Sequence, residues 1–139
     1  MPVKTIVSIW PLFAGLSLIG LAVGVQGRLL GVRAELEGFD DYLIGLLMSC
    51  YFAGFLAGSL LTPKMIQRVG HIRIFAALSA VASVTILVHS IYVNPWAWAL
   101  MRLLTGFAFS TIYVVSESWL NQASNNTNRG QILSLYTAI

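Results

Sequence analysis

Two ionisable side chains, Arg102 and Glu117, stand in an otherwise apolar stretch of the sequence and are the clearest candidates for chemistry. In hydrocarbon a charge costs at least about 2.5 to 3.5 kcal/mol on insertion scales, so each is expected to face protein or a water-filled cavity. Along a helix the two would lie roughly 22 Å apart, which excludes an ion pair between them. Each charge therefore needs another partner.

A helix would place these charges on one face with a series of small, hydroxylic and aromatic residues. At 100° per residue, this face falls within an arc of roughly 100°. The arrangement predicts one wall of a solute pathway through a bilayer. The face comprises Arg102, Gly106, Phe109, Ser110, Tyr113 and Glu117, of which Arg102, Gly106, Ser110, Tyr113 and Glu117 are the candidate pathway residues.

Each charge also has a structural alternative. Arg102 either lines a central cavity or reaches the membrane interface or a backbone carbonyl. Glu117 either handles a proton or a substrate, or it pairs with a basic loop residue such as Arg68 or Arg129. The residues alone leave both choices open.

The elements that must position these residues are long apolar helices. Four stretches each hold about 20 predominantly apolar residues, enough to cross a hydrocarbon core of roughly 30 Å. The sequence therefore predicts an all-α, polytopic transmembrane bundle in a lipid bilayer, with a fifth helix that starts at residue 130. The predicted spans are residues 6–25, 42–61, 74–93 and 96–120.

Composition excludes several other classes of protein. Hydrophobic residues make up 58% of the chain and charged residues 9%, which is too little polar surface for a water-soluble domain of this size. The net charge of +3 does not indicate a nucleic-acid partner, because the eight Lys and Arg residues are dispersed, mostly among loops, rather than gathered on one face. We expect no enzyme, metal or cofactor, because no ligand or nucleophile cluster and no phosphate-binding loop is present.

Basic residues in the short connections predict the orientation of the bundle. Five lie on the side of the N-terminus, whereas two lie on the other side beside four carboxylates. Because Lys and Arg favour the cytoplasmic side, we expect a cytoplasmic N-terminus. The five are Lys4, Lys64, Arg68, Arg73 and Arg129, and the two are Arg28 and Arg33, beside Glu35, Glu37, Asp40 and Asp41.

Small residues recur at a spacing of four, which places them on one face of a helix. In lipid, such positions favour close packing between helices, because no hydrophobic force drives the helices together. We therefore interpret these positions as packing sites rather than ligand sites. They are Gly20 and Gly24 in the first stretch, and Ala53, Gly54, Ala57 and Gly58 in the second.

The order of these features resembles the N-terminal third of a major facilitator superfamily transporter. Residues 68–73, Arg-Val-Gly-His-Ile-Arg, are similar to the end of the superfamily's loop signature between its second and third helices. Arg102 with Gly106 is similar to the Arg-x-x-x-Gly element of the fourth helix, and Arg129 with Gly130 to the Arg-Gly at the start of the fifth.

The resemblance implies a partial superfamily fold over residues 1–139, with one three-helix repeat, the start of the next, and the C-terminal helices of the carrier missing. It also implies a cytoplasmic gating loop. Two positions depart from the loop signature, Pro63 for the usual glycine and Gln67 for the usual aspartate, so the loop lacks an acidic member. The implied gating residues are Lys64, Arg68, Gly70 and Arg73.

By resemblance, the function is secondary active transport of a small-molecule substrate by alternating access, in a bacterial inner (plasma) membrane. Residues 70–73 and 117–121 are similar to a bacterial branch of sugar or drug efflux-like carriers. For a coupling proton, Glu117 is the available carboxylate. The alternative from another class is a small four-helix membrane subunit with a structural or assembly role and no transport activity.

Overall fold

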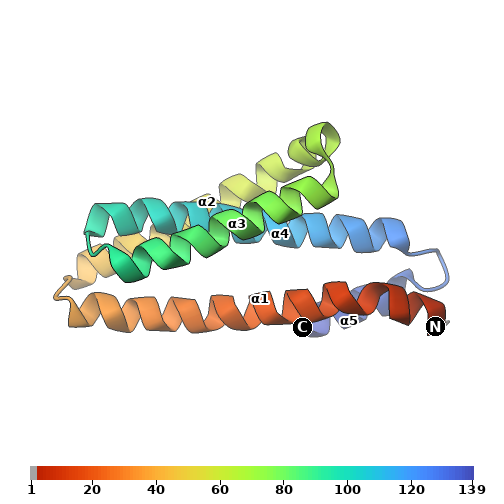
Figure 1. Cartoon of the computed structure of the whole chain (residues 1–139), viewed down its shortest axis with the longest axis horizontal. Coiled ribbons are helices and arrows are strands. Elements are labelled where there is room, and N and C mark those ends of the chain that lie inside the picture. Colours follow the sequence, from red (N-terminus) through yellow and green to blue (C-terminus); the bar gives the residue numbers. More distant parts are fainter. Residues whose placement is uncertain (1–2) are drawn as a thin grey trace.

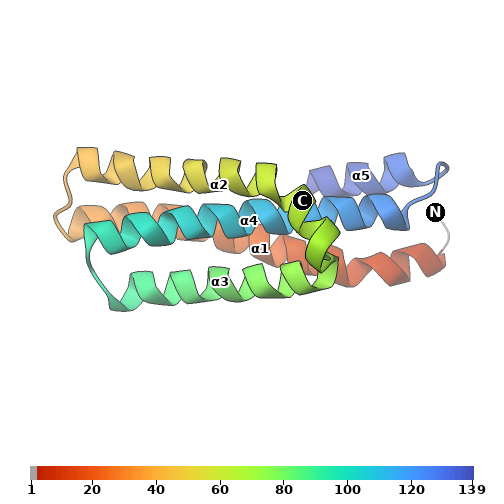
Figure 2. The same cartoon turned by 90° about the horizontal axis from the view of Figure 1, so that it is seen from above.

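The computed structural model describes residues 3–139, except for the side chains of Thr5 and Ile6. Every regular element within this range is an α-helix, as the sequence predicts. The five helices run back and forth along one long axis (Figures 1 and 2). They are α1 (Val3–Leu36), α2 (Asp41–Val69), α3 (His71–Ile91), α4 (Pro95–Ala123) and α5 (Arg129–Ala138).

Four helices, α1 to α4, are long and apolar enough to cross a bilayer. Several of them extend past the predicted spans. With 34 residues, α1 reaches about 51 Å, well beyond a hydrocarbon core of about 30 Å. The difference arises because lipid limits the length of the apolar run, whereas the helix itself continues through the polar residues beyond it.

The two ends of the bundle carry different connections. The start of α1 lies at one end with the α2–α3 and α4–α5 connections, and this end is called the N-terminal end below (Figure 1). The α1–α2 and α3–α4 connections lie at the opposite end (Figure 2). Five basic residues of the predicted cytoplasmic side therefore belong to the N-terminal end.

Short caps and turns set these connections. Gly70 alone separates α2 from α3, and its φ of +95° is a conformation that residues with a Cβ rarely adopt. Asp40 caps α2 by accepting a hydrogen bond from the Leu43 amide (2.8 Å). Asn94 caps α4 by accepting a hydrogen bond from the Trp96 amide (2.9 Å).

The contact between α2 and α4 is so close that the two backbones touch. A methyl group on Gly54 would collide with the Leu103 carbonyl of α4, and one on Gly106 would collide with the Tyr51 carbonyl of α2. A methyl group on Gly58 would lie 2.7 Å from the Phe107 carbonyl of α4, one turn beyond Leu103. The prediction that Gly54 and Gly58 serve helix packing is therefore confirmed.

Hydroxyl pairs join α4 to both of its neighbours. The Thr62 hydroxyl of α2 lies 3.0 Å from that of Thr111, and the Thr85 hydroxyl of α3 lies 2.9 Å from that of Thr105. All four residues are buried. Because no water competes for these groups inside a bilayer, the pairs fix the lengthwise register of α2 and α3 on α4.

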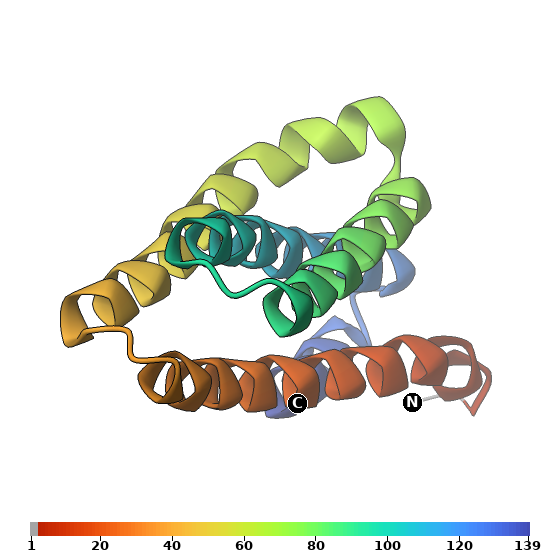
Figure 3. The same ribbon diagram turned by 60° about the vertical axis from the view of Figure 1, so that its left-hand side comes forward.

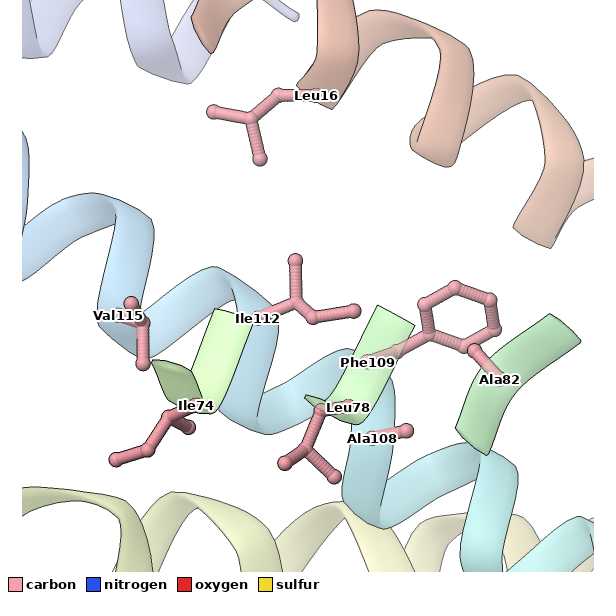
Figure 4. Close-up of a cluster of buried hydrophobic side chains, with 8 residues drawn as sticks. All are labelled: Leu16, Ile74, Leu78, Ala82, Ala108, Phe109, Ile112 and Val115. Atoms are coloured by element: carbon pink, nitrogen blue, oxygen red, sulfur yellow. The ribbon is translucent and has the colours of Figure 1, made fainter. Parts of the chain in front are cut away.

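In contrast, α1 runs along one side of the other spanning helices with most of its surface exposed (Figure 3). Leu16 is its contribution to the largest buried cluster, and its side chain points toward Ile112 of α4 (Figure 4). Near the N-terminal end, Ile9 packs with Leu120 of α4 and Ile132 of α5.

At the opposite end, Arg33 attaches α1 to α3 and α4. Its guanidinium donates a hydrogen bond to the Ser90 carbonyl (3.3 Å) and lies 5.8 Å from the centre of the Trp98 ring. It also pairs with Glu37 one turn further along (3.6 Å). Trp98 is fully buried and donates its indole N–H to the Tyr92 carbonyl (2.7 Å). This attachment was not predicted from the sequence.

Candidate functional site

The predicted pathway face of α4 is divided between two surroundings. Gly106 and Ser110 lie in the contact with α2 and are buried there, and Arg102 is buried against the same helix. Tyr113 faces α1 instead and is partly exposed, whereas Glu117 is exposed near the N-terminal end. The five residues therefore share a helix face without sharing one site.

Arg102 is buried between α4 and α2, with 4% of its surface exposed. Its guanidinium carbon lies 4.5 Å from the centre of the Tyr51 ring, and one terminal nitrogen lies 3.6 Å from the Met48 sulfur. These contacts stabilise a cation through the negative face of the ring. Within residues 3–139, no carboxylate lies within ion-pair distance of Arg102, and its Nε is buried without a hydrogen-bond partner.

An open groove lies further along this face, between α1, α4 and the end of α5. Its volume is about 840 Å³. Tyr113 is the predicted pathway residue that lines it, and Arg102 does not. The other lining residues are Ser17, Gly20, Leu21, Gly24, Val25 and Arg28 of α1, with Ala138 and Ile139.

The α1 wall of this groove was not predicted from the sequence. Gly20 and Gly24 were assigned to helix packing, yet a methyl group on either would meet no described atom within 4 Å. Helical periodicity could have revealed this wall, as it revealed the polar face of α4. At 100° per residue, Ser17, Gly24 and Arg28 fall within an arc of about 40°. These polar and small residues form one face of α1, which borders the groove together with Tyr113 of α4.

A smaller hollow of about 260 Å³ adjoins the groove. It shares Gly20, Tyr113 and Ile139 with the groove and adds Leu16 and Tyr136 to the lining. The two spaces together extend from the middle of α1 toward α5. Tyr113 is their common side chain from α4 and is therefore well placed to contact a bound solute.

The predicted gating loop lies at the N-terminal end of the bundle. Lys64, Arg68 and Arg73 are exposed, and within the described part of the chain none of them forms an ion pair. Gly70 supplies the single-residue turn between α2 and α3. The fold thus gathers the four residues around one tight turn, and a gating role for them stays a prediction.

A histidine missed by the prediction attaches this turn to α4. His71 lies immediately after Gly70, and its Nε2 is 3.0 Å from the Ser118 hydroxyl. The hydrogen bond couples the α2–α3 connection to the part of α4 that carries Glu117. The turn is therefore held to α4 at this point.

Glu117 and Arg129 lie near the same end without pairing. Across residues 3–139 Glu117 forms no ion pair, so the suggested pairing with Arg68 or Arg129 is not found. The Arg129 side chain instead donates from Nε to the Ser124 hydroxyl (3.4 Å). Arg129 and Gly130 begin α5, one residue earlier than the sequence predicted.

Comparison with known proteins gives the family of this chain. The sequence model of the Major Facilitator Superfamily matches residues 5–139. The chain belongs to the major facilitator superfamily. Members of this superfamily are membrane transporters, so the chain is an integral membrane protein and not an enzyme. The resemblance, the all-α class and the exclusion of an enzyme are thereby confirmed.

Bacterial relatives carry the same superfamily name. An uncharacterized MFS-type transporter of Enterobacter sp. (strain 638) is 32% identical over 128 residues, which are 92% of this chain and 34% of that protein. The uncharacterized MFS-type transporter YcaD of Escherichia fergusonii is 33% identical over 128 residues, which are again 92% of this chain and 34% of that protein. The chain thus spans about a third of the length of these relatives. No solved structure matches it.

The superfamily motif of α4 does not line the groove. The superfamily element Arg102 with Gly106 lies wholly in the α2–α4 contact, where Gly106 allows the backbones to touch. The groove is formed instead by α1, Tyr113 and the end of α5. The recognisable motif and the open space therefore lie at different levels along the same face of α4, because Tyr113 is about two turns beyond Gly106.

Proposed function

We propose that this chain forms one wall of a secondary active carrier that moves a small solute across a bacterial inner membrane by alternating access. The observation that carries the proposal is the groove of about 840 Å³ beside α1, in a chain that belongs to a transporter superfamily. Such a carrier holds its solute near the bilayer midplane, between two groups of helices that rock against each other. The remaining helices of the carrier would supply the opposite wall.

The position of the groove along α1 supports a midplane site. The middle of the predicted span, residues 6–25, falls next to Leu16 and Ser17, which line the adjoining hollow and the groove respectively. Gly20, one turn further along, lines both spaces and leaves the α1 backbone uncovered, so a solute could approach it closely. No phosphate-binding loop occurs in the sequence, which favours an ion gradient over ATP as the energy source.

Cysteine labelling tests alternating access directly. Ser17→Cys is placed in the complete gene product with Cys50→Ala, and an impermeant methanethiosulfonate reagent is added to right-side-out or inverted vesicles. A thiolate forms only where water reaches it, so we expect labelling from both sides of the membrane. Leu18→Cys is the matched control, because Leu18 lies in the same turn and is 68% exposed, yet does not line the groove and is expected to face lipid.

The labelling pattern decides between the proposals. Modification of Ser17→Cys from a single side, with Leu18→Cys unmodified, would overturn alternating access and leave a one-sided pocket. Modification from neither side would remove the pathway altogether and favour the structural or assembly subunit.

We further propose that the N-terminal end of the bundle lies in the cytoplasm. The five basic residues of this end support the orientation, because Lys and Arg in short loops favour the cytoplasmic side. Gln67 is exposed in this region, so labelling of a Gln67→Cys variant reports on which side of the membrane this end lies. Labelling by an impermeant reagent added to intact cells would contradict the assignment.

For the coupling ion we propose the proton, with Glu117 as its carrier. Glu117 is the single carboxylate of α4, it is exposed, and it lies one residue from Ser118, which His71 contacts. Glu117→Gln removes the titratable group and nearly keeps the side-chain shape. Transport that keeps its pH dependence in this variant would exclude Glu117 as the proton carrier.

A further inference from the structure

The groove beside α1 has a marked charge preference. Arg28 is the single charged residue among those that line it, and the lining includes no carboxylate. The remaining polar groups are neutral, namely the hydroxyls of Ser17 and Tyr113. The wall that this chain supplies therefore favours an anion over a cation.

The Arg28 guanidinium is free to bind a ligand. Within residues 3–139 it forms no ion pair and no hydrogen bond, although Arg33 five residues along makes both. A guanidinium in this state offers a planar set of N–H donors that matches the two oxygens of a carboxylate. Of the two arginines of α1, Arg33 therefore has a structural role, whereas Arg28 is available to bind a ligand.

The depth of Arg28 also favours a ligand role. It lies three residues beyond the predicted apolar span of residues 6–25, which is about 4.5 Å along the helix. The guanidinium therefore lies at the edge of the apolar zone, toward the end opposite the N-terminal end. A charge at this level is stabilised by water or a ligand rather than by hydrocarbon, and the groove gives the guanidinium an open space.

The shape of the groove defines the rest of the ligand. Ser17 and Arg28 lie about 16 Å apart along the helix, and Gly20 and Gly24 leave the space between them open. Leu21 and Val25 give this stretch apolar edges, while Tyr113 contributes an aromatic ring with a hydroxyl. The space therefore suits an elongated body that is largely apolar.

We infer that the groove takes an organic anion: its carboxylate binds Arg28, and its body lies along Gly24 and Gly20 toward Tyr113. This inference rests on the proposed carrier function and names the class of its substrate. Arg28 sets the charge specificity, and the two glycines make room for the ligand.

Binding of three matched probes tests the inference. The probes are 4-phenylbutyrate, 4-phenylbutan-1-ol and 4-phenylbutylamine, which share one skeleton and differ in charge. Thermal stabilisation of the complete gene product in phosphatidylcholine nanodiscs reports binding, because a ligand of the folded state raises the melting temperature. We expect the anion to stabilise the protein most and the amine not at all.

Variants of two arginines locate the effect. We expect Arg28→Gln to weaken 4-phenylbutyrate binding at least about tenfold, the loss of one charge-assisted contact, and Arg28→Lys to retain part of the affinity. Arg33→Gln is the matched control and should bind the anion as the unmodified protein does. Unchanged affinity in Arg28→Gln would overturn the inference and is the result expected if this guanidinium lies among lipid phosphates.

A third variant separates the groove from its charge. Gly24→Leu should fill the space without loss of folding, because a side chain there meets open space, and it should abolish binding of the anion. Anion binding that persists in Gly24→Leu would also overturn the inference. Ser17→Cys labelling from both sides combined with equal binding of all three probes would retain the carrier and reject only the anionic substrate.

Discussion

The α2–α4 contact and the exposed face of α1 use the same residue type for opposite purposes. In the contact, Gly54 and Gly106 remove Cβ atoms so that two backbones can touch. On α1, Gly20 and Gly24 remove side chains and nothing described fills the space, which becomes a groove. Gly20 and Gly24 have the same spacing of four as Gly54 and Gly58, so a small-residue stripe by itself is compatible with either close packing or an open surface.

The two regions also treat charge differently. Arg102 is buried against Tyr51 and Met48, where the ring and the sulfur surround the guanidinium. Arg28 lies at the groove without a described partner. An arginine of a spanning helix is therefore a candidate ligand site only where the structure leaves an open space beside it.

The largest effect that can break this comparison is expected at Gly54. Gly54→Leu would force α2 away from the Leu103 carbonyl, and overpacking of this kind should cost about 3 kcal/mol or more. We expect loss of folded protein, or a strongly lowered melting temperature, in detergent-purified complete gene product. Gly20→Leu is the matched variant on α1, and a comparable loss there would show that the α1 glycines pack as well.

A smaller effect is expected at Leu16, where α1 joins the main cluster. Leu16→Ala should lower the unfolding free energy by about 1 to 2 kcal/mol, less than in a water-soluble core, because lipid replaces part of the lost contact. Leu18→Ala should have no measurable effect, since Leu18 is exposed. Equal effects of the two substitutions would show that α1 is rotated relative to the structure.

The hydroxyl pairs of α4 should contribute less. A double-mutant cycle of Thr62→Val and Thr111→Val should give a coupling free energy of about 0.6 kcal/mol, typical of hydrogen bonds between membrane helices. Unfolding in denaturant measures the three variants. Purely additive effects would indicate that the two hydroxyls do not bond to each other.

The smallest change in stability is expected at Arg33. Its ion pair with Glu37 is solvent-exposed, so Arg33→Gln should change the unfolding free energy by no more than about 0.5 kcal/mol. The attachment of α1 should nevertheless loosen locally, and hydrogen exchange near Leu36 should become faster. Unchanged exchange there would show that the contacts to Ser90 and Trp98 do not hold α1.

Prediction from the sequence succeeded where a single helix carries the signal. The apolar runs predicted the four long helices, and they placed the start of α5 within one residue of its observed position. Prediction was incomplete where two helices must meet. The face containing Arg102 and Tyr113 was identified, but its division between α2 and the groove depends on how the neighbouring helices are placed.

The sequence by itself determined that the chain is a bundle of membrane helices, because apolar run length and bilayer thickness are properties of single segments. It also determined the superfamily, through the order of motifs along the chain. Only the tertiary structure decided which glycines are packed and which are open, and which arginine is covered and which is free. These outcomes depend on distances between residues far apart in sequence, and helical periodicity alone contains no information about those distances.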